Sequence, residues 1–336
     1  MVRRICYVFG MLFWITQITS CSSFVPIQRY LAQPVECTPI VHDSSDGLLL
    51  DNSLMCSSAS IPCAFPVTTR SIPNLEYPLF TVERRNIGLD NPVSFWRSGC
   101  AGLYQVSSAP AKLVVVYING YNGRPTGWKP IYNELQALPV THIFFNYPTG
   151  DSLETTAMVL SSLLCSNVRQ LRDKGIVLLG HSQGGFIAVR TAQILSQHSF
   201  SPAIRQIVTL VTPWDGCKLA RYAKLVNPVS PKVFDDIDTD SKFIHTVKSS
   251  PLPPETTYTL IYGATAESSK TANPNDELFT TENQLATGRN IKPTSTHNVL
   301  TSHAESLRDN EVVMLIKGCV EQCLMNFKTS SYTNQR

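Results

Sequence analysis

The chain has 336 residues, of which 43% are hydrophobic and 16% charged, with 17 Gly, 22 Pro and 10 Cys. This composition excludes collagen-like, coiled-coil and strongly disordered chains, and the length suits one α/β domain with a sizeable core, or two smaller domains. The net charge is only +3 and no block of five or six basic residues occurs, so we expect no nucleic acid as a partner.

The N-terminal segment has the pattern of an export signal. Arg3 and Arg4 precede an apolar stretch from Ile5 to Ile15, which is shorter than the roughly 20 residues needed to cross a bilayer. A buried core helix is the alternative, but an arginine pair at the extreme N-terminus argues against it. We therefore expect residues 1–20 to be a signal peptide.

The end of this segment, Ile18-Thr19-Ser20-Cys21, resembles the bacterial lipobox. The resemblance implies that Cys21 is lipidated, becomes the first mature residue and anchors the chain to a membrane. With Ser22 next, it implies a periplasmic or outer-membrane lipoprotein. The alternative is an ordinary cleaved signal, a plain thiol at Cys21 and a secreted protein.

Eight cysteines follow Cys21, and an even number in an exported chain predicts disulfides, although their connectivity stays open. Cys165 lies on the apolar face of a predicted helix, which favours a buried thiol. Cys319 and Cys323 have no nearby histidine and are a weak metal site. We expect no metal and no cofactor.

The chain divides into three parts after the signal. Residues 21–75 are rich in Pro, Ser and Cys and are interpreted as a linker and N-terminal arm. Residues 76–327 alternate strands and helices, which predicts an α/β domain with a largely parallel sheet. Residues 328–336 are expected to be a flexible tail. Apolar, β-branched runs predict buried strands at 113–118, 142–146, 176–179, 207–211 and 258–262.

Helices are expected between these strands. Asp151-Ser-Leu-Glu154 has the form of a capping box that opens a helix running to about Asp173. Further helices are expected at 185–197 and 310–325. The intervening segment 214–256 contains several prolines and is interpreted as an irregular insertion that could cover a site as a lid.

The sequence Gly180-His181-Ser182-Gln183-Gly184-Gly185 carries the strongest chemical signal. It follows a predicted strand directly and opens a predicted helix, which is the context of a G-x-S-x-G nucleophile elbow. The flanking glycines allow a strained turn that exposes the Ser182 hydroxyl above the sheet. A serine that merely caps a helix is the alternative.

A serine nucleophile needs a base and an acid further along the chain. His303 is favoured as the base because it lies just before the last predicted helix, and His297 in the same predicted loop is the alternative. Asp276 is favoured as the acid after the 258–262 strand, while Glu267, Glu277 and Glu282 are the other candidates there.

The turn Asn119–Gly123 follows the valine-rich strand and is rich in glycine. Its backbone N–H groups could supply one half of an oxyanion hole, and the N–H of Gln183 the other. A plain β-turn is the alternative, since Asn-Gly favours one.

Three aspartates, Asp236, Asp238 and Asp240, have the spacing of a calcium loop. The sixth position of that loop is Ser241 and the twelfth is Val247, where Gly and Glu are expected. The cluster is therefore interpreted as solvated, helix-capping carboxylates.

The elbow, the Asn119–Gly123 turn and the segment Thr212-Pro213-Trp214-Asp215-Gly216 together resemble the α/β-hydrolase superfamily, in particular its bacterial lipases and esterases. The resemblance covers about residues 112–317. It implies an α/β-hydrolase fold, Ser182 as nucleophile, Asp276 as acid, His303 as base, and backbone oxyanion donors at Tyr121 and Gln183.

Two positions depart from the family pattern. Asn119 replaces the usual histidine of the oxyanion turn, and Glu277 replaces the glycine that commonly follows the acid.

The expected function is hydrolysis of carboxylic esters, lipid or small, through an acyl-enzyme. A thioesterase or amidase on the same triad, and a non-catalytic envelope scaffold, are the alternatives.

Overall fold

The computed structural model describes residues 67–106, 111–198, 201–226 and 230–333. The expected signal peptide, Cys21 and most of the expected N-terminal arm lie outside the described residues.

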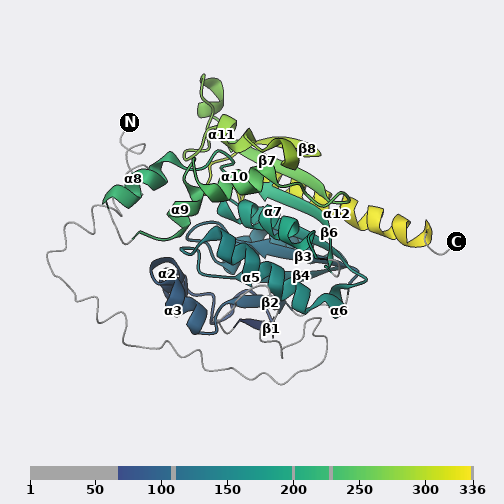
Figure 1. Cartoon of the computed structure of the whole chain (residues 1–336). Coiled ribbons are helices and arrows are strands. Elements are labelled where there is room, and N and C mark those ends of the chain that lie inside the picture. Colours follow the sequence, from purple (N-terminus) through teal and green to yellow (C-terminus); the bar gives the residue numbers. More distant parts are fainter. Residues whose placement is uncertain (1–66, 107–110, 199–200, 227–229, 334–336) are drawn as a thin grey trace.

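An eight-stranded, mostly parallel sheet forms the centre of the molecule, in the order β1-β2-β4-β3-β5-β6-β7-β8 (Figure 1). Strands β3 to β8 run parallel to one another, whereas β2 is antiparallel to β4, and β1 is parallel to β2. This arrangement, flanked by helices, is the expected α/β-hydrolase fold. The strands are β1 (Thr68–Ile72), β2 (Gly102–Val106), β3 (Leu113–Ile118), β4 (Val140–Asn146), β5 (Gly175–His181), β6 (Ala203–Leu210), β7 (Thr257–Ala264) and β8 (Ser295–Leu300).

Helices cover both faces of the sheet (Figure 1). Helices α5 (Leu153–Ser166) and α7 (Gln183–Leu195) pack against each other on one face, and α4 (Lys129–Leu135) and α12 (Asn310–Thr333) pack on the other. The remaining α-helices are α2 (Val82–Asp90), α3 (Pro92–Arg97), α6 (Val168–Leu171), α8 (Lys218–Val226), α9 (Val233–Ile237), α10 (Lys242–Ser249) and α11 (Thr281–Leu285).

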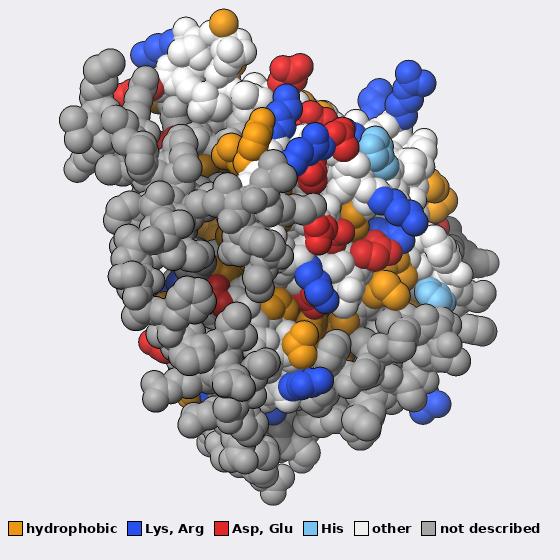
Figure 2. Space-filling view, turned by 60° about the vertical axis from the view of Figure 1, so that its left-hand side comes forward, with side chains coloured by type: hydrophobic (Ala, Val, Ile, Leu, Met, Phe, Trp, Pro, Cys, Tyr) orange, Lys and Arg blue, Asp and Glu red, His pale blue; other side chains and the backbone are white. Residues whose placement is uncertain are grey.

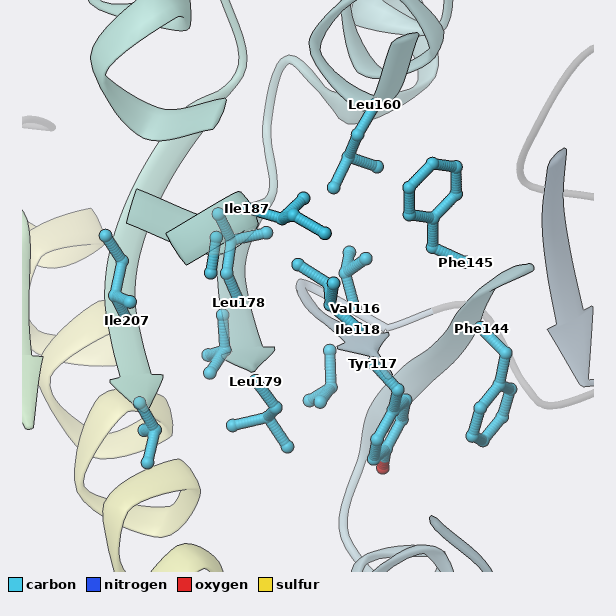
Figure 3. Close-up of a cluster of buried hydrophobic side chains, with 14 of the residues drawn as sticks. Val116, Tyr117, Ile118, Phe144, Phe145, Leu160, Leu178, Leu179, Ile187 and Ile207 are labelled. Carbon is cyan, nitrogen blue, oxygen red and sulfur yellow. The ribbon is translucent and has the colours of Figure 1, made fainter. Parts of the chain in front are cut away.

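The core lies on both sides of the central strands. Every residue of β3 is buried. Leu160 of α5 and Ile187 of α7 lie on one side of the sheet, and Tyr117 of β3 and Leu179 of β5 lie on the other (Figure 3). Burying one such side chain stabilises the fold by roughly 1.5–3 kcal/mol. The core therefore fixes the ends of the strands, and the loops that carry the candidate site residues follow these ends.

All five predicted strands are confirmed, with ends shifted by a few residues, but three strands lack the apolar signal that would have predicted them. The polar strand β1 extends the sheet into the expected N-terminal arm, so the domain begins before residue 76. The outer strand β8 leaves most of its side chains at least half-exposed. His297 therefore lies in a strand and not, as predicted, in a loop.

The predicted helices are confirmed with corrected ends. Helix α5 begins after Ser152, whose hydroxyl accepts a hydrogen bond from Thr155 N–H at 3.3 Å, so Ser152 and not Asp151 is the N-cap. It ends at Ser166, well before Asp173, because Asn167 leaves helical geometry. Helix α12 continues to Thr333 and replaces most of the expected tail 328–336.

The insertion 214–256 is more regular than predicted, since it contains α8, α9 and α10. Pro231 lies between α8 and α9, and Pro251, Pro253 and Pro254 follow α10. Among the described cysteines, Cys100 is disulfide-bonded, and Cys217, Cys319 and Cys323 are buried thiols. Cys165 lies near the end of α5 and is only half-buried, contrary to the predicted buried thiol.

Acidic and basic side chains are interspersed on the face shown in Figure 2, over the part of it that is described. Within the described ranges, no helix combines the length and the apolar character that a membrane span requires.

Candidate active site

Ser182 occupies a sharp turn between β5 and α7. Its backbone has φ 53° and ψ −124°, a region that non-glycine residues rarely adopt and that marks stored strain. The Ser182 N–H donates to Leu210 O at 2.8 Å, and the Thr212 hydroxyl donates to Ser182 O at 2.9 Å. These two bonds to the end of β6 and the loop after it hold the strained residue in place, as an elbow requires.

Glycines let the elbow approach its neighbours. A Cβ on Gly180 would lie 2.4 Å from Gly184 O, and one on Gly184 would lie 2.3 Å from Ile118 O. Both distances are far below van der Waals contact, so neither position accepts a larger residue without backbone movement. Because Ile118 pairs with Gly180, the turn after β3 and the elbow after β5 leave the same edge of the sheet.

The structure joins the three residues favoured as nucleophile, base and acid. His303 Nε2 lies 2.9 Å from Ser182 Oγ, and His303 Nδ1 lies 2.7 Å from Asp276 Oδ2. A carboxylate only accepts hydrogen bonds, so His303 carries its proton on Nδ1 and presents a lone pair on Nε2 to the serine hydroxyl. All three side chains are buried.

Asp276 is fixed by its own loop. Its Oδ1 accepts hydrogen bonds from Leu278 N–H at 3.0 Å and Phe279 N–H at 2.7 Å, and its carbonyl accepts the His303 N–H at 2.8 Å. The Asp276 side chain is fully buried, and these two N–H donors fix the direction of its carboxylate. Glu277 has a positive φ of 80°, a conformation that glycine adopts most easily. This explains why glycine commonly follows the acid in the α/β-hydrolases that the sequence resembles.

The other candidates lie elsewhere. His297 sits in β8 and pairs with Ile261. The side chains of Glu267, Glu277 and Glu282 are exposed, whereas Asp276 has no accessible surface.

The Asn119–Gly123 turn packs directly on the elbow. A Cβ on Gly120 would lie 3.0 Å from Ser182 Cβ, and Tyr121 and Gln183 line the same cavity as Ser182. Asn119 anchors the turn, because its side-chain oxygen accepts from Trp128 Nε1 at 2.9 Å and its carbonyl accepts from the Tyr147 hydroxyl. Sequence reasoning missed Trp128, Tyr147 and the Thr212 hydroxyl as supports, since no local pattern links them to the site.

A cavity of about 360 Å³ opens over Ser182 and His303. Phe234 and Ile237 of α9 line one part of its wall, and Leu278 and Phe279 of the acid loop line another. The rings of Tyr121 and Phe234 lie 5.6 Å apart. Residues of the insertion therefore form part of the cavity wall, which is largely apolar.

The three aspartates with the spacing of a calcium loop do not converge on one point. Asp236 accepts hydrogen bonds from the Ser152 hydroxyl and Leu153 N–H, while Asp238 and Asp240 both contact Arg221. Burial raises the pKa of Asp236. Within the described ranges, no cluster of three or more His, Cys, Asp or Glu side chains could hold a metal ion.

The strand order and the elbow of this chain define an α/β-hydrolase fold. No protein-family model matches the sequence, and no curated protein matches it.

Similar solved structures have low sequence identity. The lin2722 gene product of Listeria innocua is 12% identical, with a TM-score of 0.49 over 61% of this chain and 92% of that one. The mature Bacillus licheniformis lipase BlEst2 is 17% identical, with a TM-score of 0.47 over 62% and 93%. The metagenomic carboxyl esterase MGS0156 is 15% identical, with a TM-score of 0.44 over 58% and 67%.

Proposed function

We propose that the chain is a serine hydrolase that cleaves carboxylic esters through an acyl-enzyme. The observation that carries this proposal is the continuous hydrogen-bonded series from Ser182 Oγ through His303 to Asp276 Oδ2, set at a strained strand-to-helix turn. A non-catalytic scaffold would have no need for a serine in this backbone conformation beside an oriented imidazole.

The first half of the reaction forms the acyl-enzyme. Ser182 Oγ attacks the ester carbonyl carbon while its proton passes to His303 Nε2. The carbonyl oxygen becomes negative and is stabilised by the backbone N–H groups of Tyr121 and Gln183, which is the role we propose for them. The imidazolium then gives its proton to the departing alkoxide, and the acyl group stays on Ser182.

The second half of the reaction hydrolyses the acyl-enzyme and regenerates the free enzyme. His303 takes a proton from water, the hydroxide oxygen attacks the acyl carbon, and the imidazolium protonates Ser182 Oγ as the acid product leaves. Asp276 keeps the His303 proton on Nδ1 and stabilises the imidazolium in both halves. No step requires a cofactor or a metal.

The cavity wall supports an acyl group as the bound part of the substrate. Tyr121, Phe234, Ile237 and Phe279 present an apolar surface beside Ser182. Apolar pockets with few polar groups bind apolar ligands through burial of surface. We therefore favour esters of apolar acids, with the insertion 214–256 acting as the cover of the site.

We also propose that the protein is exported and lipid-anchored through Cys21, on the sequence pattern alone. A Cys21→Ala variant expressed in a Gram-negative bacterium should move from the membrane fraction to the soluble fraction. If wild type and variant were distributed equally, the anchor would be contradicted.

Matched substrates with one acyl group on oxygen, sulfur or nitrogen test the reaction class. We expect the oxyester to be hydrolysed with the largest kcat/KM, and Ser182→Ala to lower kcat by about 10³-fold or more without loss of the fold. A preference for the thioester or amide would reassign the substrate class. Undiminished turnover by the variant would remove Ser182 as nucleophile.

A further inference from the structure

The mechanism above assigns no role to His181, the residue before the nucleophile. Its Nε2 lies 3.1 Å from the Ser306 hydroxyl oxygen, and its ring centroid lies 5.4 Å from that of His303. The ring is enclosed by protein, although part of its surface faces the cavity that it lines. His181 therefore connects the elbow to the turn that carries the base.

The direction of these hydrogen bonds follows from counting protons. The Ser306 hydroxyl donates its single hydrogen to His303 O, 2.9 Å away. It must therefore accept from His181, which places a proton on His181 Nε2. The other ring nitrogen, Nδ1, faces the oxyanion turn, because a Cβ on Gly120 would lie 2.8 Å from it.

The ring is held neutral. Burial, and next the nearness of His303, lower the pKa of His181 to about 3, while the backbone of His303 opposes this weakly. A neutral His181 places no positive charge beside the imidazolium that must form on His303.

We propose that His181 is a positioning residue for His303. Its Nε2–H holds the Ser306 hydroxyl, which holds the His303 carbonyl, so that His303 Nε2 stays 2.9 Å from Ser182 Oγ. This inference rests on the proposed function and deepens it, because it accounts for how the base loop is kept in register with the elbow.

Three variants test the contact through kinetics. In His181→Gln the amide nitrogen can reach the place of Nε2, whereas in the matched His181→Asn it is one methylene short. Ser306→Ala removes the hydroxyl. With p-nitrophenyl butyrate as substrate, we expect Asn and Ala to lower kcat by about 10- to 100-fold with KM changed less than about twofold, because base geometry and not binding is lost.

The kcat of His181→Gln should be close to that of wild type and well above that of His181→Asn. The double variant His181→Asn/Ser306→Ala should have a kcat no lower than that of the less active single variant, because both substitutions break the same connection. Equal losses in Gln and Asn, unchanged kcat in Asn and Ala, or additive losses would overturn the proposal. Melting temperatures identify any variant that fails to fold, and the Gln–Asn comparison stands without Ser306→Ala.

A second readout does not depend on catalysis. In ¹⁵N NMR of the full chain, His181 should be neutral with its proton on Nε2 from pH 5 to 8, and Ser306→Ala should shift the His303 resonances. A charged ring at pH 6 or a proton on Nδ1 would overturn the positioning role. If wild type shows the expected tautomer yet hydrolyses no ester, the proposed function fails while the His181–Ser306 contact is supported.

Discussion

Asp276 illustrates how much of the site depends on a single buried carboxylate. Replacing it by Asn keeps the shape but removes the charge that fixes the His303 tautomer. We expect Asp276→Asn to lower kcat by about 10³- to 10⁴-fold, which steady-state kinetics would measure. Glu277→Gln is the matched control, because its side chain is exposed and should change kcat less than twofold. Equal losses in the two variants would contradict the assignment of the acid.

Gly120 is the residue at which the oxyanion turn meets the elbow. An added Cβ would approach His181 Nδ1 to 2.8 Å and Ser182 Cβ to 3.0 Å, so Gly120→Ala must push the turn away from the nucleophile. We expect kcat to fall about 10- to 100-fold at little cost in melting temperature. Gly318→Ala on α12, where a Cβ meets nothing within 4 Å, is the control. Unchanged kcat in Gly120→Ala would show that the turn does not serve the reaction.

The sequence singled out the three residues that the structure brings together because each follows a positional rule: a glycine-flanked serine after a strand, then an acid and a histidine in chain order. The supporting residues have no such rule. Trp128 and Thr212 reach Asn119 and Ser182 from other segments of the chain, through contacts that only the folded chain defines. The choice of Asp276 over its neighbours likewise depends on burial, which composition does not reveal.

At the scale of elements, α9 is tied to the start of α5. The Asp236 carboxylate accepts from the Ser152 hydroxyl at 2.7 Å and from Leu153 N–H at 2.6 Å, at the positive end of the α5 dipole. Asp236→Asn weakens both bonds and should lower the free energy of unfolding by about 1–2 kcal/mol in urea titrations.

The control is Asp235→Asn, an exposed neighbour on the same helix, which we expect to change the free energy of unfolding by less than about 0.5 kcal/mol. A loss as large in Asp235→Asn as in Asp236→Asn would mean that general surface charge, and not the tie to α5, carries the effect.

Periodicity predicted the buried strands well because a strand covered on both faces is a continuous apolar run. It failed for β1 and β8, whose partly exposed positions carry Thr, Arg, Ser and Asn. It also failed for the buried strand β2, whose apolar residues are interrupted by Gly102 and Gln105. Neighbouring residues can also offer alternative helix caps. Both Asp151 and Ser152 could cap α5 by their residue type, and the structure uses Ser152. The insertion was predicted to be irregular because its helices are short and are separated by proline or by polar residues.

For the whole molecule, buried neutral histidines make stability fall in acid. Burial lowers the pKa of His142 to about 4. As the pH falls below about 6.5, His142 becomes protonated in the unfolded chain, whereas in the folded chain it stays neutral until near pH 4. The free energy of unfolding that His142 contributes is therefore present at neutral pH and is lost as the pH falls from about 6.5 to about 4.

His142→Asn tests this, because Asn can still pair with the Tyr117 hydroxyl, 2.9 Å from His142 Nδ1, but does not titrate. Between pH 7 and 4.5, wild type should lose about 2 kcal/mol more unfolding free energy than the variant. Urea titrations at both pH values give the difference. Parallel losses in the two proteins would show that His142 is not a source of the acid sensitivity.

Covalent labelling distinguishes an activated nucleophile at Ser182 from an ordinary serine hydroxyl. The purified protein is treated with a fluorophosphonate, and the adduct is located by mass spectrometry, with His303→Ala as the control that keeps the serine but removes its base. We predict one adduct on Ser182 in wild type and labelling at least 100-fold slower in the variant. No adduct on Ser182, or equal labelling rates in the two proteins, would show that Ser182 is not a nucleophile activated by His303.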